Sequence, residues 1–362
     1  RALYMYTSTP SVIGFGGKTT YGAGASGTTL GGNMYAITFE NADGRITARE
    51  NTSQRINYPS NWVSEYTVGN LSAKVEKFIS NENVAVTTVY LTNPTDSEQI
   101  ITATAASEFV NNKSQVEIGG KKQSELKGTV NSPAELTKIT TRLTGDGFDY
   151  SQSADNALTK TVTIPAGGTE EIKVVMAFTT EELPGSTEDY IRFAQMDGKT
   201  ALKTQKKEYN AYWAENLPYI DVPNKAVQKA IDYRWWLERF NTMDANIPGY
   251  DYQYPVTIEG VLGYNNAIAL TQPMHLQDTK WLRNAYLPYG QLLSVGNSSQ
   301  SSAFLDNPGN RSNWNNHYGQ YIADAGVEAF NVIGGSEQLA ENLAYYFEHD
   351  AKGQIEHYGN HT

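Results

Sequence analysis

The stretch NVAVTTVYL at residues 83–91, closed by the turn sequence NPTD, decides the fold class. β-Branched and aromatic residues dominate this stretch, and Asn, Pro and Asp are typical turn residues. Runs of the same kind occur at residues 33–40, 158–164 and 171–178, and the turn sequence PAGG separates the last two. Short runs of this composition with turn residues between them predict an antiparallel β-sandwich.

The composition changes near residue 186, and this change predicts the domain boundaries. The sequence STED at residues 186–189 resembles a helix start, with acidic residues in the first turn. Threonine is also rare in the last part of the chain, since 30 of the 35 Thr lie in residues 1–222. We therefore predict a β-sandwich (supersandwich) domain over residues 1–185, linker helices over 186–222, and helical hairpins over 223–362.

Apolar residues recur at helical spacing in the last of these segments. Pro223 suits a first helical turn, and the first helix is expected to end near Met243. Five helices form an incomplete helical domain, so we expect the chain to be part of a larger fold. The further helices are predicted at residues 262–272, 276–294, 316–333 and 336–349, with Gly334 and Gly335 ending the third of these.

The composition excludes several classes of function. The 362 residues include no Cys, which removes disulfide scaffolds, thiolate metal sites and cysteine nucleophiles. With 28 Lys+Arg against 39 Asp+Glu and no basic cluster, the chain does not resemble a nucleic-acid-binding protein. No apolar run approaches the ~18–20 residues that cross a membrane. We predict no cofactor and no metal site, although a structural calcium in a loop stays open.

A tyrosine-rich loop before a predicted helix is the first candidate site. The sequence PGYDYQYPVTIEG at residues 248–260 includes Tyr252 and Glu259, and Asn265 and Asn266 follow it. Aromatic rings cover the CH faces of sugars, amides bind their hydroxyl groups, and cleavage of a glycosidic bond requires a positioned carboxylic acid. Glu259 is therefore the candidate catalytic residue. The alternative is an acid that only complements a helix dipole.

Two further groups of residues support a sugar site. The sequence NWNNHYGQY at residues 313–321 is dense in aromatic and hydrogen-bonding side chains, although a polar packing patch between helices would explain it too. On the first helix, Arg239 either lines the pocket or pairs with a nearby acid. The substrate-binding residues predicted from these segments and from the Tyr252 loop are Trp236, Arg239, Tyr252, Asn265, Asn266, Trp314, Asn316, His317 and Tyr318.

These segments resemble a known family. A β-sandwich, linker helices and helical hairpins with aromatic, carboxylate-bearing loops resemble the six-hairpin (α/α)6-barrel glycosidases with an N-terminal supersandwich. The sequences YPVTIEGVLGYNNAIALT, HLQDTKWLRN and NNHYGQYIADAGVEAFNVIGG, which begin at Tyr254, His275 and Asn315, look most like the bacterial β-L-arabinobiosidases. Those enzymes release an arabinofuranose disaccharide from plant hydroxyproline-rich glycoproteins.

The resemblance implies a glycoside hydrolase located outside the bacterial cell or on its surface. Its substrate would be an oligosaccharide or a glycoprotein glycan. The family uses three acidic residues in one pocket, of which only Glu259 has a match here, so we expect the other two beyond Thr362. Because hydrolysis needs two carboxyl groups, the acid, base and nucleophile roles stay unassigned, and the isolated chain could be inactive.

Two other functions fit the same residues. A glycoside phosphorylase of this architecture would use phosphate in place of an activated water, so a single carboxylic acid would suffice. A non-catalytic carbohydrate-binding fragment is the third interpretation.

Overall fold

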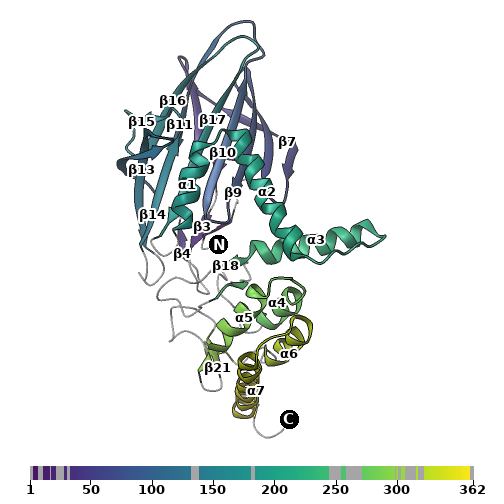
Figure 1. Ribbon diagram of the computed structural model, residues 1–362. Coiled ribbons are helices and arrows are strands. Elements are labelled where there is room, and N and C mark those ends of the chain that lie inside the picture. Colours follow the sequence, from purple (N-terminus) through teal and green to yellow (C-terminus); the bar gives the residue numbers. More distant parts are fainter. Residues whose placement is uncertain are drawn as a thin grey trace.

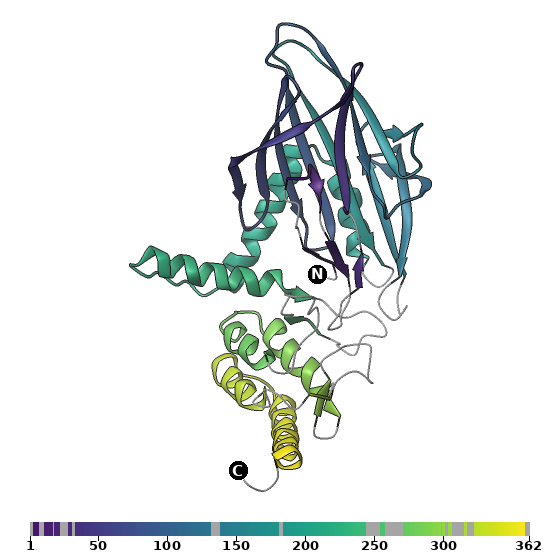
Figure 2. The same cartoon turned by 180° about the vertical axis from the view of Figure 1, so that it is seen from behind.

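The computed structural model describes residues 3–6, 11–16, 18–21, 28–30, 33–131, 138–180, 184–243, 254–257, 271–297, 299–300, 303–305, 315–316 and 322–358. These residues form antiparallel sheets followed by seven helices (Figures 1 and 2). The sandwich lies at one end of the molecule and α4–α7 lie at the other end. Between them, α3 (Lys225–Phe240) projects sideways.

The sandwich consists of two main antiparallel sheets. The larger has the strand order β12-β13-β14-β17-β10-β9-β8-β7, and the smaller has the order β15-β16-β11-β5-β2, with β6 paired to β5. A third small sheet has the order β1-β3-β4. The strands are β1 Leu3–Tyr6, β2 Gly14–Phe15, β3 Lys18–Tyr21, β4 Thr28–Leu30, β5 Tyr35–Asn41, β6 Gly44–Ile46, β7 Ala48–Asn57, β8 Trp62–Val68, β9 Leu71–Ile79, β10 Val84–Thr92, β11 Gln99–Ala106, β12 Asn112–Ile118, β13 Lys121–Asn131, β14 Lys138–Gly145, β15 Asp149–Tyr150, β16 Ala157–Ile164 and β17 Thr169–Thr179.

The sandwich prediction is confirmed, and the four predicted strands are β5, β10, β16 and β17. Strand β10 lies inside the larger sheet, where Val89 is opposite Val75 of β9 and Ile172 of β17. All three side chains are buried between the sheets, where removal of apolar surface from water stabilises the fold. A buried hydrogen bond of 2.8 Å between the hydroxyl groups of Tyr35 and Thr87 also joins the two sheets.

The outer face of the larger sheet is covered by two helices, α1 (Gly185–Gln195) and α2 (Gly198–Asn216) (Figure 1). Phe193 of α1 packs edge-to-face on Phe78 of β9, with 5.2 Å between the ring centroids. Val86 of β10 belongs to the same buried cluster. Strand β10 is therefore buried on both faces, which explains why its sequence is rich in β-branched residues at consecutive positions. The two helices are the predicted linker helices.

A buried amine holds α1 on this sheet. Lys173 of β17 donates hydrogen bonds of 2.8 and 3.0 Å to the carbonyl oxygens of Phe193 and Ala194, in the last turn of α1. These carbonyls belong to the end of the helix, where partners within the helix are lacking. Burial lowers the pKa of Lys173 to about 8, because the charged form loses its hydration.

The rest of the described chain is helical, with short strand pairs between the helices. None of its helices is both long enough and apolar enough to cross a membrane. An apolar cluster that includes Leu276, Leu292, Ala325 and Leu343 joins four of the helices. The elements are β18 Thr242–Met243, β19 Val256–Thr257, α4 Gln272–Thr279, α5 Tyr286–Asn297, β20 Ser299–Gln300, β21 Ala303–Leu305, β22 Asn315–Asn316, α6 Ile322–Ile333 and α7 Glu337–Tyr358.

The helix predicted at residues 276–294 is wrong, because two helices occupy this range. Pro288 has no N–H group, and its ring would clash with the carbonyl of Asn284 in a continuous helix. Instead, the Asn284 side chain accepts a 2.8 Å hydrogen bond from the N–H of Tyr286, where α5 begins. Pro288 and the capping residue before it are thus local signals for the start of a separate helix.

Two other helix starts are also corrected. Pro223 lies before α3 rather than in its first turn, because the side chain of Asn224 caps the helix by accepting from the N–H groups of Ala226 and Val227. Helix α6 begins at Ile322, and Asn316 belongs to β22. The predicted end at Gly334 is confirmed, since Gly334 adopts a φ of 81° directly after α6. Of the helix predicted at 262–272, residues 262–270 lie outside the described residues.

The two buried lysines predict a stability that rises at alkaline pH. Lys77, like Lys173, has a pKa lowered by burial to about 8. Between pH 8 and the unfolded-state value of 10.5, each of these lysines binds more protons in the unfolded chain than in the folded chain, so its contribution to the free energy of unfolding increases with pH. Each lysine adds at most ~1.4 kcal/mol per pH unit. Urea denaturation from pH 7 to 9.5 measures this slope.

The double variant Lys77→Met and Lys173→Met should have a flatter profile over the same range. The exposed Lys199 supplies the control, since Lys199→Met should keep the wild-type slope. Tyrosines of the unfolded chain begin to ionise below pH 9.5 and change the slope of every variant alike, so the difference in slope between the wild type and the double variant measures the lysines. Equal slopes in the wild type and the double variant would contradict the assignment.

Candidate functional site

Most of the predicted site residues lie outside the described residues. They are Tyr252, Glu259, Asn265, Asn266, Trp314, His317 and Tyr318. Asn316 is described as part of β22, where it pairs with Phe304 of β21. Trp236 and Arg239 both lie on α3. The described residues therefore show which contacts hold the strand before Glu259 in place. They also show which residues surround Trp236 and Arg239.

The segment that leads to Glu259 is firmly anchored. Strand β19 pairs antiparallel with β18, and Val256 and Thr257 are fully buried. The carbonyl of Thr257 accepts a 2.7 Å hydrogen bond from the side-chain amide of Gln272, at the start of α4. This hydrogen bond joins Thr257, before the interval 258–270, to the start of α4 after it. In the sequence, Glu259 comes two residues after the buried Thr257.

A group of fully buried polar side chains lies near this anchor. It comprises Thr257, Gln272, Thr279, Gln291 and Ser294. Ser294 hydrogen-bonds to the backbone of Tyr254 at 3.1 Å, and Gln291 donates to the hydroxyl of Thr279 at 3.3 Å. The side-chain oxygens of Gln272 and Gln291 accept no hydrogen bond within the described part of the chain. Buried polar side chains thus lie near Thr257, whereas Val256 of the same strand belongs to the apolar cluster between the helices.

Charged side chains also join α3 to α4. His275 Nδ1 lies 3.1 Å from Glu238 Oε2, and Arg234 is 2.7 Å from Asp278. Glu238 is only 7% exposed, which is unusual for a carboxylate. Neither Glu238 nor His275 is among the site residues predicted from the sequence. Their pairing across 37 residues depends on how the helices pack, and no local pattern signals it.

Trp236 is a packing residue of the described structure. Tyr233 and Phe240 stack on its ring at centroid distances of 5.4 and 5.1 Å. Tyr233 precedes Trp236 by about one helical turn and Phe240 follows it by about one turn, the spacings at which side chains on a helix meet. Its Nε1 donates a 3.2 Å hydrogen bond to the carbonyl of Pro59 in the sandwich.

Arg239 is buried at the point where three elements meet. Its guanidinium lies 4.4, 3.7 and 5.3 Å from the ring centroids of Tyr209, Tyr212 and Trp213, all on α2. It also donates to the Asn81 side chain at 3.2 Å, in the turn between β9 and β10. Burial raises the pKa of Tyr212 despite the nearby guanidinium. These contacts connect α3 to α2 and to the sandwich, while substrate binding by Trp236 and Arg239 stays a prediction.

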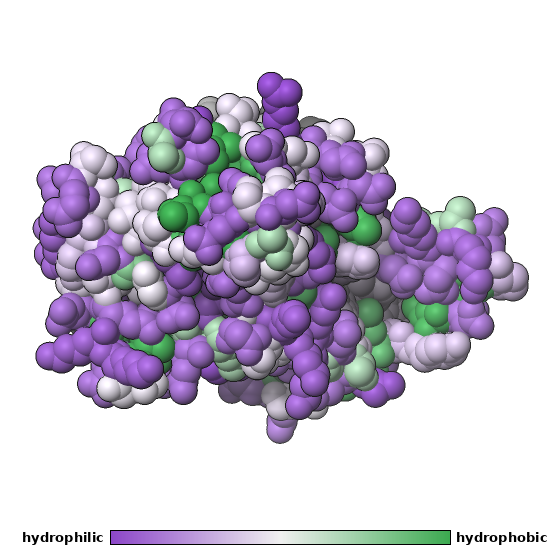
Figure 3. Space-filling model, turned by 90° about the horizontal axis from the view of Figure 1, so that it is seen from above, coloured by the Kyte–Doolittle hydropathy of each residue, from purple (hydrophilic) through white to green (hydrophobic). Residues whose placement is uncertain are grey.

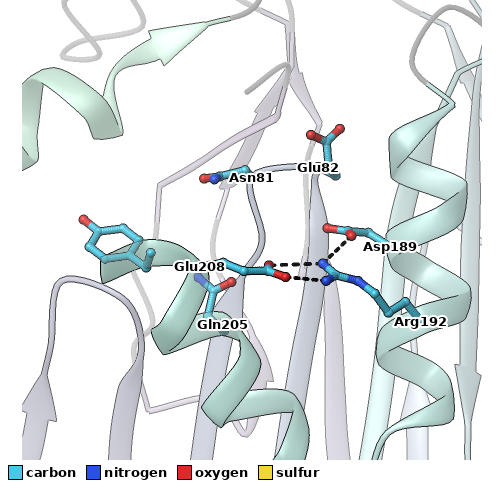
Figure 4. A pocket seen from close by; sticks show the side chains of 7 residues that line it. Asn81, Glu82, Asp189, Arg192, Gln205 and Glu208 are labelled. Atoms are coloured by element: carbon cyan, nitrogen blue, oxygen red, sulfur yellow. Dashed lines mark hydrogen bonds and ion pairs between the residues drawn. The ribbon is translucent and has the colours of Figure 1, made fainter. Parts of the chain in front are cut away.

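A polar pocket lies between α1 and α2 (Figure 4). Figure 4 shows Arg192 of α1 pointing toward Glu208 of α2, with Asp189 beside it. The guanidinium binds both carboxylates, with 2.6 Å to Asp189 and two bonds to Glu208. An ion-pair network that joins the two helices thus lines this pocket. In the described part of the chain, no group of three or more His, Cys, Asp or Glu side chains is placed to hold a metal ion.

Comparison with known proteins gives the fold a functional context. No protein-family model matches the sequence. A protein named as a kojibiose phosphorylase from the human microbiome matches 99% of this chain and 50% of its own length, with a TM-score of 0.51 and 12% identity. A family GH92 inverting mannosidase from Bacteroides thetaiotaomicron matches 94% of this chain and 48% of its own, with a TM-score of 0.50 and 13% identity.

The chain spans about half the length of these two structures. At such low identity the similarity concerns the fold alone. The β-sandwich followed by helices is thus the architecture of this chain and of enzymes that act on glycosides.

Proposed function

We propose that this chain forms part of a glycoside hydrolase and that Glu259 is a catalytic carboxylate. The observation that supports this most is the anchoring of the segment before Glu259. A fully buried strand, held by Gln272, ends two residues before this carboxylate, in a fold shared with glycoside-acting enzymes. Catalytic carboxyl groups must be held in place by rigid elements, because small displacements reduce rates strongly.

The proposed substrate is a plant-type oligosaccharide or glycoprotein glycan. The resemblance of the sequence to bacterial β-L-arabinobiosidases supports release of a β-L-arabinofuranose disaccharide. Such a substrate favours action outside the cell or at its surface. The amides and aromatic rings of residues 250–266 and 313–321 would bind the sugar, since their side chains bear few charges.

Replacing Glu259 tests the catalytic assignment. Glu259→Gln in the full-length protein should reduce kcat on β-L-arabinofuranosyl oligosaccharides by about 10²–10⁴-fold, the usual contribution of a general acid or base. A strongly acidic phenol leaves an aryl glycoside without being protonated. Retained turnover of such a substrate by Glu259→Gln would therefore identify Glu259 as the general acid. The exposed Glu341 supplies the control, and Glu341→Gln should behave as wild type. Wild-type turnover by Glu259→Gln would overturn the proposal.

Inorganic phosphate distinguishes the hydrolase from the phosphorylase. Reactions with and without phosphate should give the same free sugar if water is the acceptor. A sugar phosphate formed only when phosphate is present would identify a phosphorylase, the activity for which one of the two similar structures is named.

Gln272 is predicted to act as a positioning residue for Glu259. Gln272→Leu removes the hydrogen bond to Thr257 and leaves a buried carbonyl without that donor, which costs about 1–3 kcal/mol of stability. The displaced segment should lower kcat, while KM should change little. Gln291→Leu is the matched control, because Gln291 is equally buried but donates to Thr279. Its stability should fall similarly, but kcat should stay near wild type. Equal effects of both variants on kcat would show that Gln272 acts only through stability.

A further inference from the structure

A second pocket, of about 460 Å³, lies where the sandwich meets α2 and α3. Its walls are the turn at residues 58–60, which follows β7, and one side of each helix. Figure 3, which views the sandwich from above, shows a largely hydrophilic surface from which α3 protrudes at one side. The pocket volume falls within the ~300–1,000 Å³ typical of ligand sites.

The pocket is held in shape by hydrogen bonds from both helices. Trp236 of α3 donates to the carbonyl of Pro59, and Gln205 of α2 donates to the carbonyl of Ser60 at 3.3 Å. The turn is thus fixed on two sides without any ligand. A preformed site loses less free energy to ordering when a ligand binds.

One aromatic ring of the pocket is open to a ligand. Two protein rings stack with Trp236, and the guanidinium of Arg239 lies over the rings of Tyr209 and Trp213. The amine of Lys206 lies 5.4 Å from the centroid of the Tyr58 ring. The indole of Trp235, which is partly exposed, has no ring or cation stacked on it within the described part of the chain. It can therefore act as a flat platform for a planar or ring-shaped ligand.

The polar side chains of the pocket favour a neutral ligand. Lys206 and Asp232 both line it, so their charges cancel. Asn210 adds an exposed amide that can donate and accept hydrogen bonds. The side chain of Gln228 donates to one oxygen of Asp232 at 3.0 Å, and the other oxygen can accept from a hydroxyl group. An aromatic platform with amide, amine and carboxylate groups around it suits a sugar ring.

This pocket lies on a different side of α3 from the contacts with α4. Arg234 and Glu238, four residues apart, face α4, whereas Trp235 and Trp236 face α2 and the sandwich. Adjacent helical positions point about 100° apart, so one helix can present both sides. None of the pocket residues belongs to the segment that contains Glu259.

We propose that this pocket binds a neutral saccharide, with the Trp235 indole stacked on a sugar ring and Asn210, Lys206 and Asp232 bound to its hydroxyl groups. The ligand class rests on the proposed function, since saccharides are the substrates proposed for the Glu259 site. The pocket would hold a sugar unit apart from the bond that is cleaved.

Replacing Trp235 tests this site. In full-length protein bearing Glu259→Gln, calorimetric titration measures Kd for a neutral arabino-oligosaccharide and a neutral manno-oligosaccharide. Trp235→Ala should raise the Kd of the bound sugar by about tenfold or more, as expected when a central aromatic contact is removed. Trp235→Phe keeps a ring and should retain most of the affinity. Trp281, which is 52% exposed outside the pocket, supplies the control, and Trp281→Ala should leave Kd unchanged.

The outcomes separate this proposal from the proposed function. In protein with native Glu259, Trp235→Ala should hydrolyse a small aryl glycoside within about twofold of wild type, a change below 0.5 kcal/mol. Loss of oligosaccharide affinity with Trp235→Ala would support the pocket even if Glu259→Gln kept full activity. An unchanged Kd in Trp235→Ala would overturn the pocket, whatever the result at Glu259. Tighter binding of an anionic oligogalacturonate than of either neutral sugar would also overturn it.

Discussion

The buried guanidinium of Arg239 is the contact on which the arrangement of sandwich and helices depends. It lies against three aromatic rings of α2 and donates to Asn81 in the turn between β9 and β10. A buried charge is costly unless it has many partners, so the group favours one arrangement of these elements over others. Its planar shape suits stacking on rings, which a lysine at this position could not reproduce.

This contact links the sandwich to the candidate catalytic segment through α3. The helix ends at Phe240, and β18 follows directly and pairs with β19. Strand β19 is fully buried and leads to Glu259. The contact of Arg239 with α2 and the sandwich is thus linked to Thr257 through α3 and the pairing of β18 with β19, the described elements of this stretch. A displacement of α3 would move β18, and β19 with it.

The sandwich was predictable because its signals are local. Turn residues and runs of β-branched residues at residues 83–91 and 171–178 identify strands whether one face or both faces are buried. What the sequence did not reveal was the covering of β10 by α1, since this depends on packing between distant segments. The division of residues 276–294 into two helices was predictable, because Pro288 and Asn284 are local signals that the analysis overlooked.

The candidate site was predictable only in part, because an aromatic residue can serve packing or binding. In the sequence, Trp235 and Trp236 are neighbours of equal type, and both suit a sugar site. In the structure, Tyr233 and Phe240 both stack with Trp236, and its Nε1 donates a hydrogen bond to the carbonyl of Pro59. The difference arises from residues three before and four after Trp236, a spacing that a helix brings into contact. The same reasoning applies to other tryptophans on helices. A tryptophan with aromatic residues three before and four after it is suited to packing, and an adjacent tryptophan without them is the better candidate for ligand binding.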